Sequence, residues 1–275
     1  MKAILSCAGK LLDLGQPVVM GILNLTPDSF YDGGFYPSID DQLKQVDKMW
    51  NEGASIIDIG AVSTRPNAAQ IDGKEETRRL VPSLEAISKH FPDVIISVDT
   101  YRSGLARIAI DNGAGMINDI YGGRFEPEII DVVQSAGVPY IIMHMQGDPK
   151  NMQIMPYYKD VVGEISTYFQ ERIRKFSNSY NQIILDPGFG FGKTVSHNFQ
   201  LLNAFQEFKN LGYPLMAGLS RKSMINRVLG THPSEALNGT TVLNTVALQK
   251  GADILRVHDV KEALQAIRLV GSLNQ

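Results

Sequence analysis

Short apolar runs recur along the chain, and each of them ends in polar side chains. The clearest is Ile183, Ile184 and Leu185, a run typical of a strand that is buried on both faces. It stops at Asp186, because the proline and glycine that follow remove a backbone donor and permit a turn. Further runs of this kind lie at residues 18–24, 56–58, 94–100, 115–120, 140–145, 215–222 and 254–259.

Segments with the helical spacing of apolar residues fill the gaps between these runs. In residues 40–52, Leu43, Val46, Met49 and Trp50 form one apolar stripe. Strands that alternate with helices predict a parallel sheet, and eight such units predict a (β/α)₈ TIM barrel with its site at the carboxyl ends of the strands. The other predicted helices cover residues 75–90, 103–112, 127–136, 159–176, 199–211, 222–229, 234–250 and 260–269.

The first residues of the chain show a different, looser pattern. Apolar Leu5, Leu12 and Leu14 alternate with polar residues around Gly9-Lys10. This alternation predicts a short N-terminal β-hairpin over residues 2–16, which would close the barrel floor. No linker, charge run or low-complexity tract divides the chain, so we expect residues 1–275 to form a single domain.

Composition narrows the classes of function. The chain has 275 residues, the usual size of a one-domain barrel. Its 26 basic and 29 acidic residues give no reason to expect a nucleic-acid or membrane-surface partner. The lone Cys7 excludes an intrachain disulfide and fits a reducing compartment. No segment approaches the roughly 20 apolar residues of a membrane span, so we expect a cytoplasmic protein.

Residues 188–194, Gly-Phe-Gly-Phe-Gly-Lys-Thr, approach two nucleotide-binding motifs but match neither. A P-loop has four residues between its first glycine and the Gly-Lys pair, whereas only three separate Gly188 from Gly192. A dinucleotide fingerprint is G-x-G-x-x-G, and this segment is G-x-G-x-G. We interpret it as a loop over a pocket, with Phe189 or Phe191 as an apolar wall; the alternative is a purely structural turn.

Four polar side chains at strand ends, Asp58, Asp99, Asn118 and Asp186, are expected to meet on one face of the barrel. Each one alone is compatible with a cap or a satisfied core hydrogen bond. The set lacks the His, Cys and carboxylate spacing of a catalytic metal site. Carboxylate and amide acceptors of this kind suit a neutral heterocycle that is rich in N–H donors.

A cationic set follows strand ends as well, and it predicts an anion site. A guanidinium matches phosphate geometry and can also stack on a ring, so a phosphate-bearing substrate fits this set better than a carboxylate alone. Ser220 stands where a strand becomes a helix, which favours an anion at free backbone N–H groups, although a simple N-cap is the alternative. The cations are Arg65, Lys222, Arg256 and His258, with Thr64 and Asn24 as neutral neighbours.

Seven motifs in register along nearly the whole chain together resemble the dihydropteroate synthase family, although any one of them alone would be weak. The motifs are NLTPDSFYDGG (24–34), STRP (63–66), SVDT (97–100), IND (117–119), LDPGFGFGK (185–193), SRK (220–222) and RVHD (256–259). The resemblance implies a TIM barrel that condenses 6-hydroxymethyl-7,8-dihydropterin diphosphate with p-aminobenzoate, giving dihydropteroate and diphosphate for folate synthesis.

The resemblance also implies a role for each matching residue. Lys222, Arg256, Asp99 and Arg65 would be catalytic. The pterin would be bound by Asp99, Asn118, Asp186, Lys222 and Arg256. The diphosphate would be bound by Asn24, Thr64, Arg65, Arg256 and His258, with Asn24 meeting the accompanying Mg²⁺. The p-aminobenzoate would be bound by Ser220, Phe191 and Pro66.

The family resemblance further implies a homodimer and two long loops, residues 25–34 and 63–73, that close over the site. One position departs from the family pattern. After Thr-Arg-Pro the family usually has glycine, whereas this chain has Asn67, a residue that tolerates left-handed backbone angles.

Three other classes of protein compete with this interpretation. A pterin-binding methyltransferase barrel would share the pterin acceptors but would not need Thr64, Arg65 or the Arg256-x-His258 pair. A non-catalytic homologue would bind pterin but tends to lose loop residues, and both loops look intact here. A sugar-phosphate isomerase barrel would need a Glu or Lys base at a strand tip, and none stands out. Turnover that depends on the diphosphate separates these classes.

Overall fold

Eight parallel strands form one sheet that closes on itself. A computed structural model describes residues 3–25, 38–62 and 71–273. The strands are hydrogen-bonded in the order β8-β7-β6-β5-β4-β3-β10-β9, and a parallel bridge between Leu185 and Leu215 joins the two ends. The predicted (β/α)₈ barrel is therefore confirmed. Its strands are β3 (Val18–Asn24), β4 (Ile56–Gly60), β5 (Ile95–Asp99), β6 (Met116–Asp119), β7 (Tyr140–Met143), β8 (Ile183–Asp186), β9 (Met216–Ala217) and β10 (Ile254–Val257).

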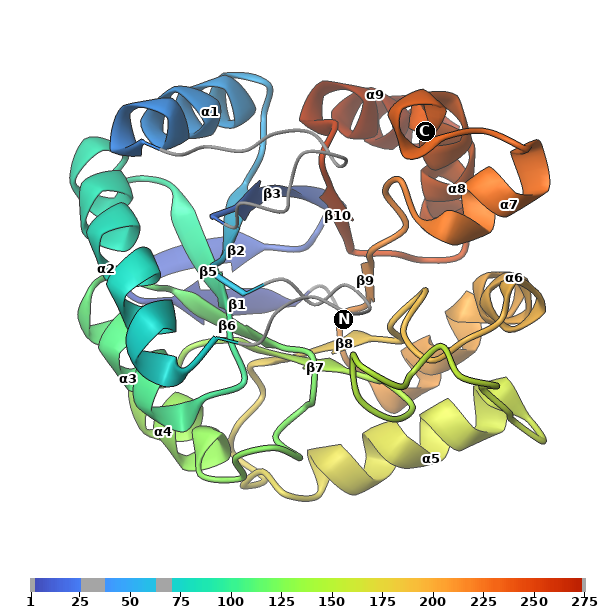
Figure 1. The fold of residues 1–275 in the computed structure, drawn as a ribbon, viewed down its shortest axis with the longest axis horizontal. Helices are drawn as coiled ribbons and strands as arrows, with labels where there is room; N and C mark the ends of the chain where they lie inside the picture. Colours follow the sequence, from blue (N-terminus) through green and yellow to red (C-terminus); the bar gives the residue numbers. More distant parts are fainter. Residues whose placement is uncertain (1–2, 26–37, 63–70, 274–275) are drawn as a thin grey trace.

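Helices surround the strands (Figure 1), and their apolar faces pack on the outside of the sheet. The packing is close where α1 crosses β3, since a Cβ atom on Gly21 would lie 2.7 Å from the sulfur of Met49. No described helix is long and apolar enough to cross a membrane. The helices are α1 (Ile39–Asn51), α2 (Gly73–His90), α3 (Ser103–Asp111), α4 (Ile129–Ala136), α5 (Val161–Ile173), α6 (Val195–Asn203), α7 (Ser223–Leu229), α8 (Leu237–Gln249) and α9 (Val260–Ser272), with 3₁₀ turns η2 (Phe205–Leu211) and η3 (Pro233–Glu235).

Two segments that were each predicted as one helix consist of an α-helix and a 3₁₀ helix in the structure. The segment predicted as one helix over 199–211 begins earlier, because Thr194 and His197 form a reciprocal capping pair, and it turns into the 3₁₀ helix η2 at Phe205. The segment predicted over 234–250 is divided at Ala236 into η3 and α8. Apolar spacing does not separate α-helix from 3₁₀-helix over so few residues.

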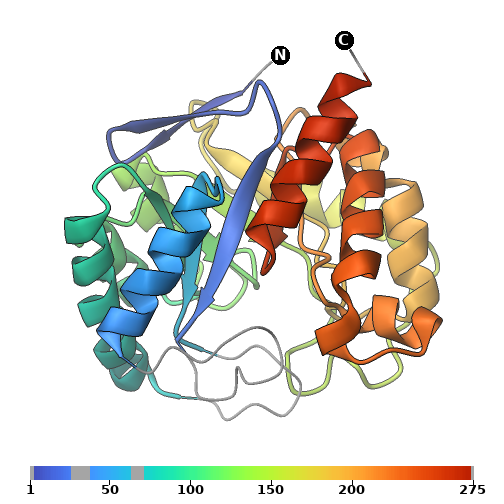
Figure 2. The ribbon, with the colours of Figure 1, turned by 90° about the horizontal axis from the view of Figure 1, so that it is seen from above.

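The N-terminal hairpin lies across the end of the barrel where the strands begin (Figure 2). Its strands, β1 (Ile4–Cys7) and β2 (Lys10–Asp13), pair antiparallel. Their inward side chains, Leu5, Cys7 and Leu12, pack against a layer to which every barrel strand contributes one residue. The predicted closure of the floor is confirmed. That layer is Met20, Ile56, Ile95, Met116, Ile141, Ile184, Met216 and Ile254.

Candidate functional site

A buried carboxylate, Asp58, is the centre of a polar network at the other end of the barrel. Its side chain is inaccessible to solvent and accepts three hydrogen bonds from three different strands. The donors are the Ser97 hydroxyl at 2.6 Å, the Asn118 amide at 3.0 Å and the Arg256 Nε at 2.7 Å. Because a buried ion is costly without partners, these bonds explain how Asp58 is tolerated in the barrel.

Arg256 connects this network to a second carboxylate. Its Nη2 lies 3.3 Å from the Asp99 Oδ2, while its Nε holds Asp58. The sequence pattern placed Arg256 just beyond a strand; in the structure it lies within β10, and its side chain is about one-fifth exposed. One guanidinium therefore bridges two carboxylates at the mouth of the barrel.

Asp99 has a strongly shifted pKa. Burial and, second, the nearby Asp58 carboxylate raise the pKa of Asp99 to about 7, although Arg256 opposes both effects. At neutral pH this group therefore exists both as a carboxylate that accepts hydrogen bonds and as an acid that donates one.

Asp186 and Lys222 form a second charged pair on the same face. Asp186 closes β8, and its Oδ1 accepts the backbone N–H of Gly188 at 2.8 Å. Burial raises the pKa of Asp186, and Lys222 opposes this. Burial likewise lowers the pKa of Lys222 to about 8, against the attraction of Asp186. A Cβ atom on Gly218 would lie 3.9 Å from both groups, so that glycine keeps the space between them open.

The glycine-rich loop supplies the apolar wall through Phe191 alone. Phe189 is fully buried and stacks on Phe205 with a centroid separation of 5.9 Å, so it belongs to the core. Phe191 remains partly exposed, and the Lys222 Nζ lies 4.7 Å from the centroid of its ring. The same Nζ donates to the carbonyl of Phe189. Of the two phenylalanines predicted as a wall, only Phe191 faces the site.

Ser220 and His258 contact each other directly. The Ser220 Oγ lies 3.0 Å from the His258 Nδ1 and accepts the His258 backbone N–H at 3.2 Å. The alternative that Ser220 is a helix N-cap is wrong, since α7 begins at Ser223 and Lys222 is its cap residue. Ser220 lies at the carboxyl end of the barrel, shortly before α7, and its predicted role in binding an anion stays a prediction.

Three residues predicted for the site lie outside the described residues: Thr64, Arg65 and Pro66, together with Asn67 of the same loop. Asn24 is described and ends β3. Gly60 lies between it and the network, since a Cβ atom there would be 3.8 Å from the Asn24 Oδ1 and 3.6 Å from the Cβ of Asp99. The structure thus brings together Asn24, Asp99, Asn118, Asp186, Phe191, Ser220, Lys222, Arg256 and His258 at one end of the barrel.

The donor set at Asn24 fits a Mg²⁺ ion that arrives with its substrate. Mg²⁺ is usually held by one or two protein oxygens together with substrate phosphates and water, rather than by a complete protein cage. The amide oxygen of Asn24 is such a ligand. Within the described residues no cluster of three His, Cys, Asp or Glu side chains could hold a metal.

Sequence reasoning missed an ion pair that supports the site from outside. Glu76 of α2 is buried and binds the Thr100 hydroxyl at 3.0 Å and the Arg102 Nε at 2.9 Å, directly after Asp99. Arg102 also donates to the carbonyl of Ile71 at 3.3 Å. The one sequence signal for this ion pair was a glutamate in a helix that also carries an apolar stripe, because glutamate is seldom buried without a partner.

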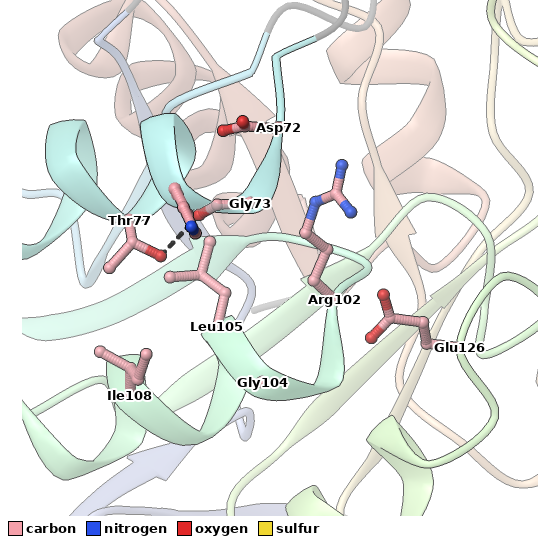
Figure 3. Close-up of a pocket in the computed structure, with 9 residues that line it drawn as sticks. Asp72, Gly73, Thr77, Arg102, Gly104, Leu105, Ile108 and Glu126 are labelled. Atoms are coloured by element: carbon pink, nitrogen blue, oxygen red, sulfur yellow. Dashed lines mark hydrogen bonds between the residues drawn. The ribbon is translucent and has the colours of Figure 1, made fainter.

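Arg102 also borders a groove of about 690 Å³ between α2 and α3 (Figure 3). None of the polar network around Asp58 lines this groove, so it is separate from the barrel mouth. Its lining is Asp72, Gly73, Lys74, Thr77, Arg102, Gly104, Leu105, Ile108 and Glu126.

Comparison with known proteins gives a consistent result. The family model described as "Pterin binding enzyme" matches residues 20–258. Dihydropteroate synthase from Escherichia coli K12 is 47% identical over 265 residues, which cover 95% of this chain and 93% of that protein. The Bacillus subtilis dihydropteroate synthase is 40% identical over 258 residues, 94% of this chain and 89% of that protein.

Comparison with solved structures points to the same family as the sequence comparisons. The Yersinia pestis dihydropteroate synthase in a sulfonamide drug complex superposes with a TM-score of 0.94 at 42% identity, covering 99% of both chains. The Xanthomonas albilineans enzyme in complex with 7,8-dihydropteroate gives 0.86 at 36% identity, again over 99% of both chains. With these matches spanning nearly its whole length, the chain belongs to the dihydropteroate synthase family of pterin-binding enzymes.

Proposed function

We propose that this chain is a dihydropteroate synthase, a transferase that joins 6-hydroxymethyl-7,8-dihydropterin diphosphate to p-aminobenzoate. The observation that carries the proposal is the mouth of the barrel, where a carboxylate and amide network lies beside a cationic set. A pterin presents an edge of N–H donors, and a departing diphosphate presents anionic oxygens. The two halves of the site match these two halves of the substrate.

The pterin is assigned to Asp99, Asn118, Asp186, Lys222 and Arg256. Asp186 is buried at the tip of β8 and keeps Oδ2 free of the backbone bond that occupies Oδ1. Asn118 already donates to Asp58, which fixes its amide and leaves its oxygen to accept. Asp58 thereby joins the proposed site as a residue that orients Asn118 and Arg256.

The diphosphate is assigned to Asn24, Thr64, Arg65, Arg256 and His258. A Mg²⁺ ion held by Asn24 and the diphosphate would supply Lewis-acid stabilisation of the negative charge. The p-aminobenzoate is assigned to Ser220, Phe191 and Pro66. Contact between Ser220 and His258 makes the two assigned subsites adjacent, as a transfer between them requires.

No protein nucleophile is needed for this reaction. The bond between the exocyclic carbon and the diphosphate oxygen breaks with its electron pair leaving on the diphosphate, where Arg65, Arg256 and His258 stabilise the charge. The electron-rich pterin shares the positive charge that remains on the carbon. The amine of p-aminobenzoate then adds and loses a proton.

We also propose a homodimer that uses the outer face of α7 and α8. Three large apolar side chains of these helices are exposed, Val228 to 59%, Leu229 to 53% and Val242 to 52%. Exposed apolar side chains that lie together often mark association surfaces. Sedimentation should give twice the 30.3 kDa mass of one chain, and Leu229→Asp should return it to the monomer mass. A monomer in the unchanged protein would contradict the proposed dimer.

The activity is tested with dihydropterin diphosphate, p-aminobenzoate and Mg²⁺, following dihydropteroate and diphosphate together. We expect equal amounts of both products. Lys222→Ala and Arg256→Ala should each reduce the rate by about 10²–10³-fold, the usual cost of losing one group that stabilises transition-state charge. Lys44→Ala is the matched control, because Lys44 is exposed on α1 and its amine lies near Asp41 of the same helix.

The outcomes separate the competing classes. Tight pterin binding without product would indicate a non-catalytic homologue. Turnover that does not depend on the diphosphate would indicate methyl transfer. Absence of pterin binding would exclude the proposed function.

A further inference from the structure

The loop after β8 is held by side chains at five consecutive carbonyls. The Gly188 and Phe191 carbonyls accept from Lys193, and the Phe189 carbonyl accepts from Lys222. The Gly190 carbonyl accepts from the Gln153 amide, and the Gly192 carbonyl accepts from the Tyr158 hydroxyl. Gly188, Phe189 and Gly192 are buried, and a buried carbonyl needs a hydrogen-bond partner, which side chains supply here.

Lys193 is the one donor that bonds two of these carbonyls. It is 3% exposed, and its Nζ lies 3.0 Å from the Gly188 oxygen and 2.9 Å from the Phe191 oxygen. The same Nζ reaches the His144 carbonyl at 3.3 Å and the His144 Nδ1 at 3.1 Å. The amine thus ties both ends of the loop to the end of β7.

The surroundings of the amine are rich in hydrogen-bond acceptors. Burial lowers the pKa of Lys193, and the charge of Asp186 opposes this effect. Burial and the charge of Lys193 lower the pKa of His144 to about 2, so its neutral ring can offer a lone pair at Nδ1. An ammonium has three N–H donors, and oxygen or nitrogen acceptors surround them here.

These contacts also argue against a phosphate-binding role for Lys193, which its place after Gly192 would suggest by analogy with a P-loop. In a P-loop the lysine of the Gly-Lys pair reaches a bound phosphate. Here the Lys193 amine is directed at carbonyl oxygens of its own loop rather than at a phosphate site. Its function is therefore to be sought in the loop that it holds.

That loop has little conformational preference of its own. Gly188, Gly190 and Gly192 have φ of +69°, +82° and +63°, and chains rich in glycine lose much entropy when they are ordered. Yet two groups of the candidate site depend on its shape. The carbonyl of Phe189 receives the Lys222 amine, and the ring of Phe191 lies 4.7 Å from that amine.

We propose that Lys193 is a positioning residue, whose buried amine holds the 188–192 loop so that Phe191 faces the acceptor substrate. The identity of that substrate, p-aminobenzoate, rests on the proposed function. The positioning of Phe191 does not, and the experiment keeps the two apart.

The direct readout is ¹⁹F NMR of protein labelled with 4-fluorophenylalanine. The chain has 11 phenylalanines, and the Phe191 signal is identified as the one lost in Phe191→Leu. In Lys193→Met, which keeps the length but removes the donor, we expect the Phe191 signal to shift and broaden. Lys209→Met is the matched control, since Lys209 is also a bonded lysine but pairs with Asp253 away from the loop. It should leave the Phe191 signal unchanged.

Kinetics provide the second readout. Lys193→Met should raise the KM for p-aminobenzoate at least roughly tenfold, since a small misplacement of a positioning group has effects of this size. Pterin affinity should fall by less than this, because of the five residues assigned to the pterin only Asp186 and Lys222 contact the loop. Propylamine should restore KM in Lys193→Ala, since it replaces the missing atoms from Cγ to Nζ. If Lys193→Met does not fold, Lys193→Gln keeps two donors and should give an intermediate change.

The outcomes distinguish the two proposals. An unchanged Phe191 signal in folded Lys193→Met, or equal losses of pterin and p-aminobenzoate binding, would overturn the positioning role. A shifted signal in a protein whose unchanged form makes no dihydropteroate would overturn the proposed function and leave the positioning role standing.

Discussion

Asp58 and Asp99 illustrate how one strand-end pattern yields two kinds of carboxylate. Asp58 accepts from Ser97, Asn118 and Arg256 and is shielded from solvent, whereas Asp99 accepts from Arg256 and reaches the barrel mouth. The sequence shows both as an aspartate at the end of an apolar run. What separates them is the identity of residues up to 198 positions away, which only the closed barrel brings together.

The pKa values of Asp99 and Lys222 predict a pH profile. If Asp99 accepts hydrogen bonds from the pterin, its carboxylate form is required, and kcat/KM should rise with pH through about 7. If Lys222 donates, its ammonium form is required, and kcat/KM should fall above about 8. The profile for the pterin substrate should therefore be a narrow bell.

Lys222→Arg checks the assignment of the alkaline limb. An arginine stays protonated throughout this range, so the fall above pH 8 should disappear even if the maximal rate is lower. The acid limb near pH 7 should remain. An alkaline limb that persists in Lys222→Arg would show that another group causes it.

At the same scale, the residues of the site were largely predictable from the sequence, whereas the hydrogen bonds and ion pairs among them were not. Convergence of Asp99, Asn118, Asp186, Lys222 and Arg256 follows from the rule that the carboxyl ends of parallel strands meet at one edge. The roles of Asp58, Glu76 and Lys193 were missed, because each binds protein groups rather than open space. The helix cap predicted as an alternative for Ser220 was wrong, since cap positions depend on a boundary that shifts by one or two residues.

At the scale of the element, we expect alanine substitutions at two glycines to change the stability of the protein in opposite directions. Gly188 has φ of +69°, and a Cβ atom there would lie 2.0 Å from the His144 carbonyl oxygen, so Gly188→Ala should destabilise the protein by more than about 1 kcal/mol. Gly104 lies in α3 and a Cβ atom would meet nothing within 4 Å, so Gly104→Ala should stabilise it by about 0.4–1 kcal/mol. Urea unfolding of the two variants measures both. Equal effects would show that the loop tolerates a side chain.

The first residue of a helix depends on capping side chains, which the spacing of apolar residues does not reveal. Helix α2 begins at Gly73 rather than at residue 75, because the Asp72 carboxylate accepts the Glu75 N–H at 2.8 Å. Helix α5 begins at Val161 rather than at residue 159, because Asp160 caps it. Strand order, in contrast, was implied by the repeated βα unit and is confirmed.

At the scale of the molecule, the hairpin predicts a contrast between two leucines. Leu5 is 2% exposed and packs in the layer that closes the barrel, whereas Leu11 on the next strand is 74% exposed. Leu5→Ala should destabilise the protein by about 2–5 kcal/mol. Leu11→Ala should change the free energy of unfolding by less than about 0.5 kcal/mol. Similar effects of the two changes would mean that the hairpin contributes little to the barrel.

The position of both chain ends near the hairpin decides how the protein can be immobilised. Helix α9 runs back from the mouth, so both ends of the described chain, residues 3 and 273, lie toward the hairpin end of the molecule (Figure 2). An affinity handle at either end would therefore tether the molecule to a biosensor chip with its open mouth directed to the flowing solution. Ligand kinetics recorded on such a chip should match those of the untethered protein.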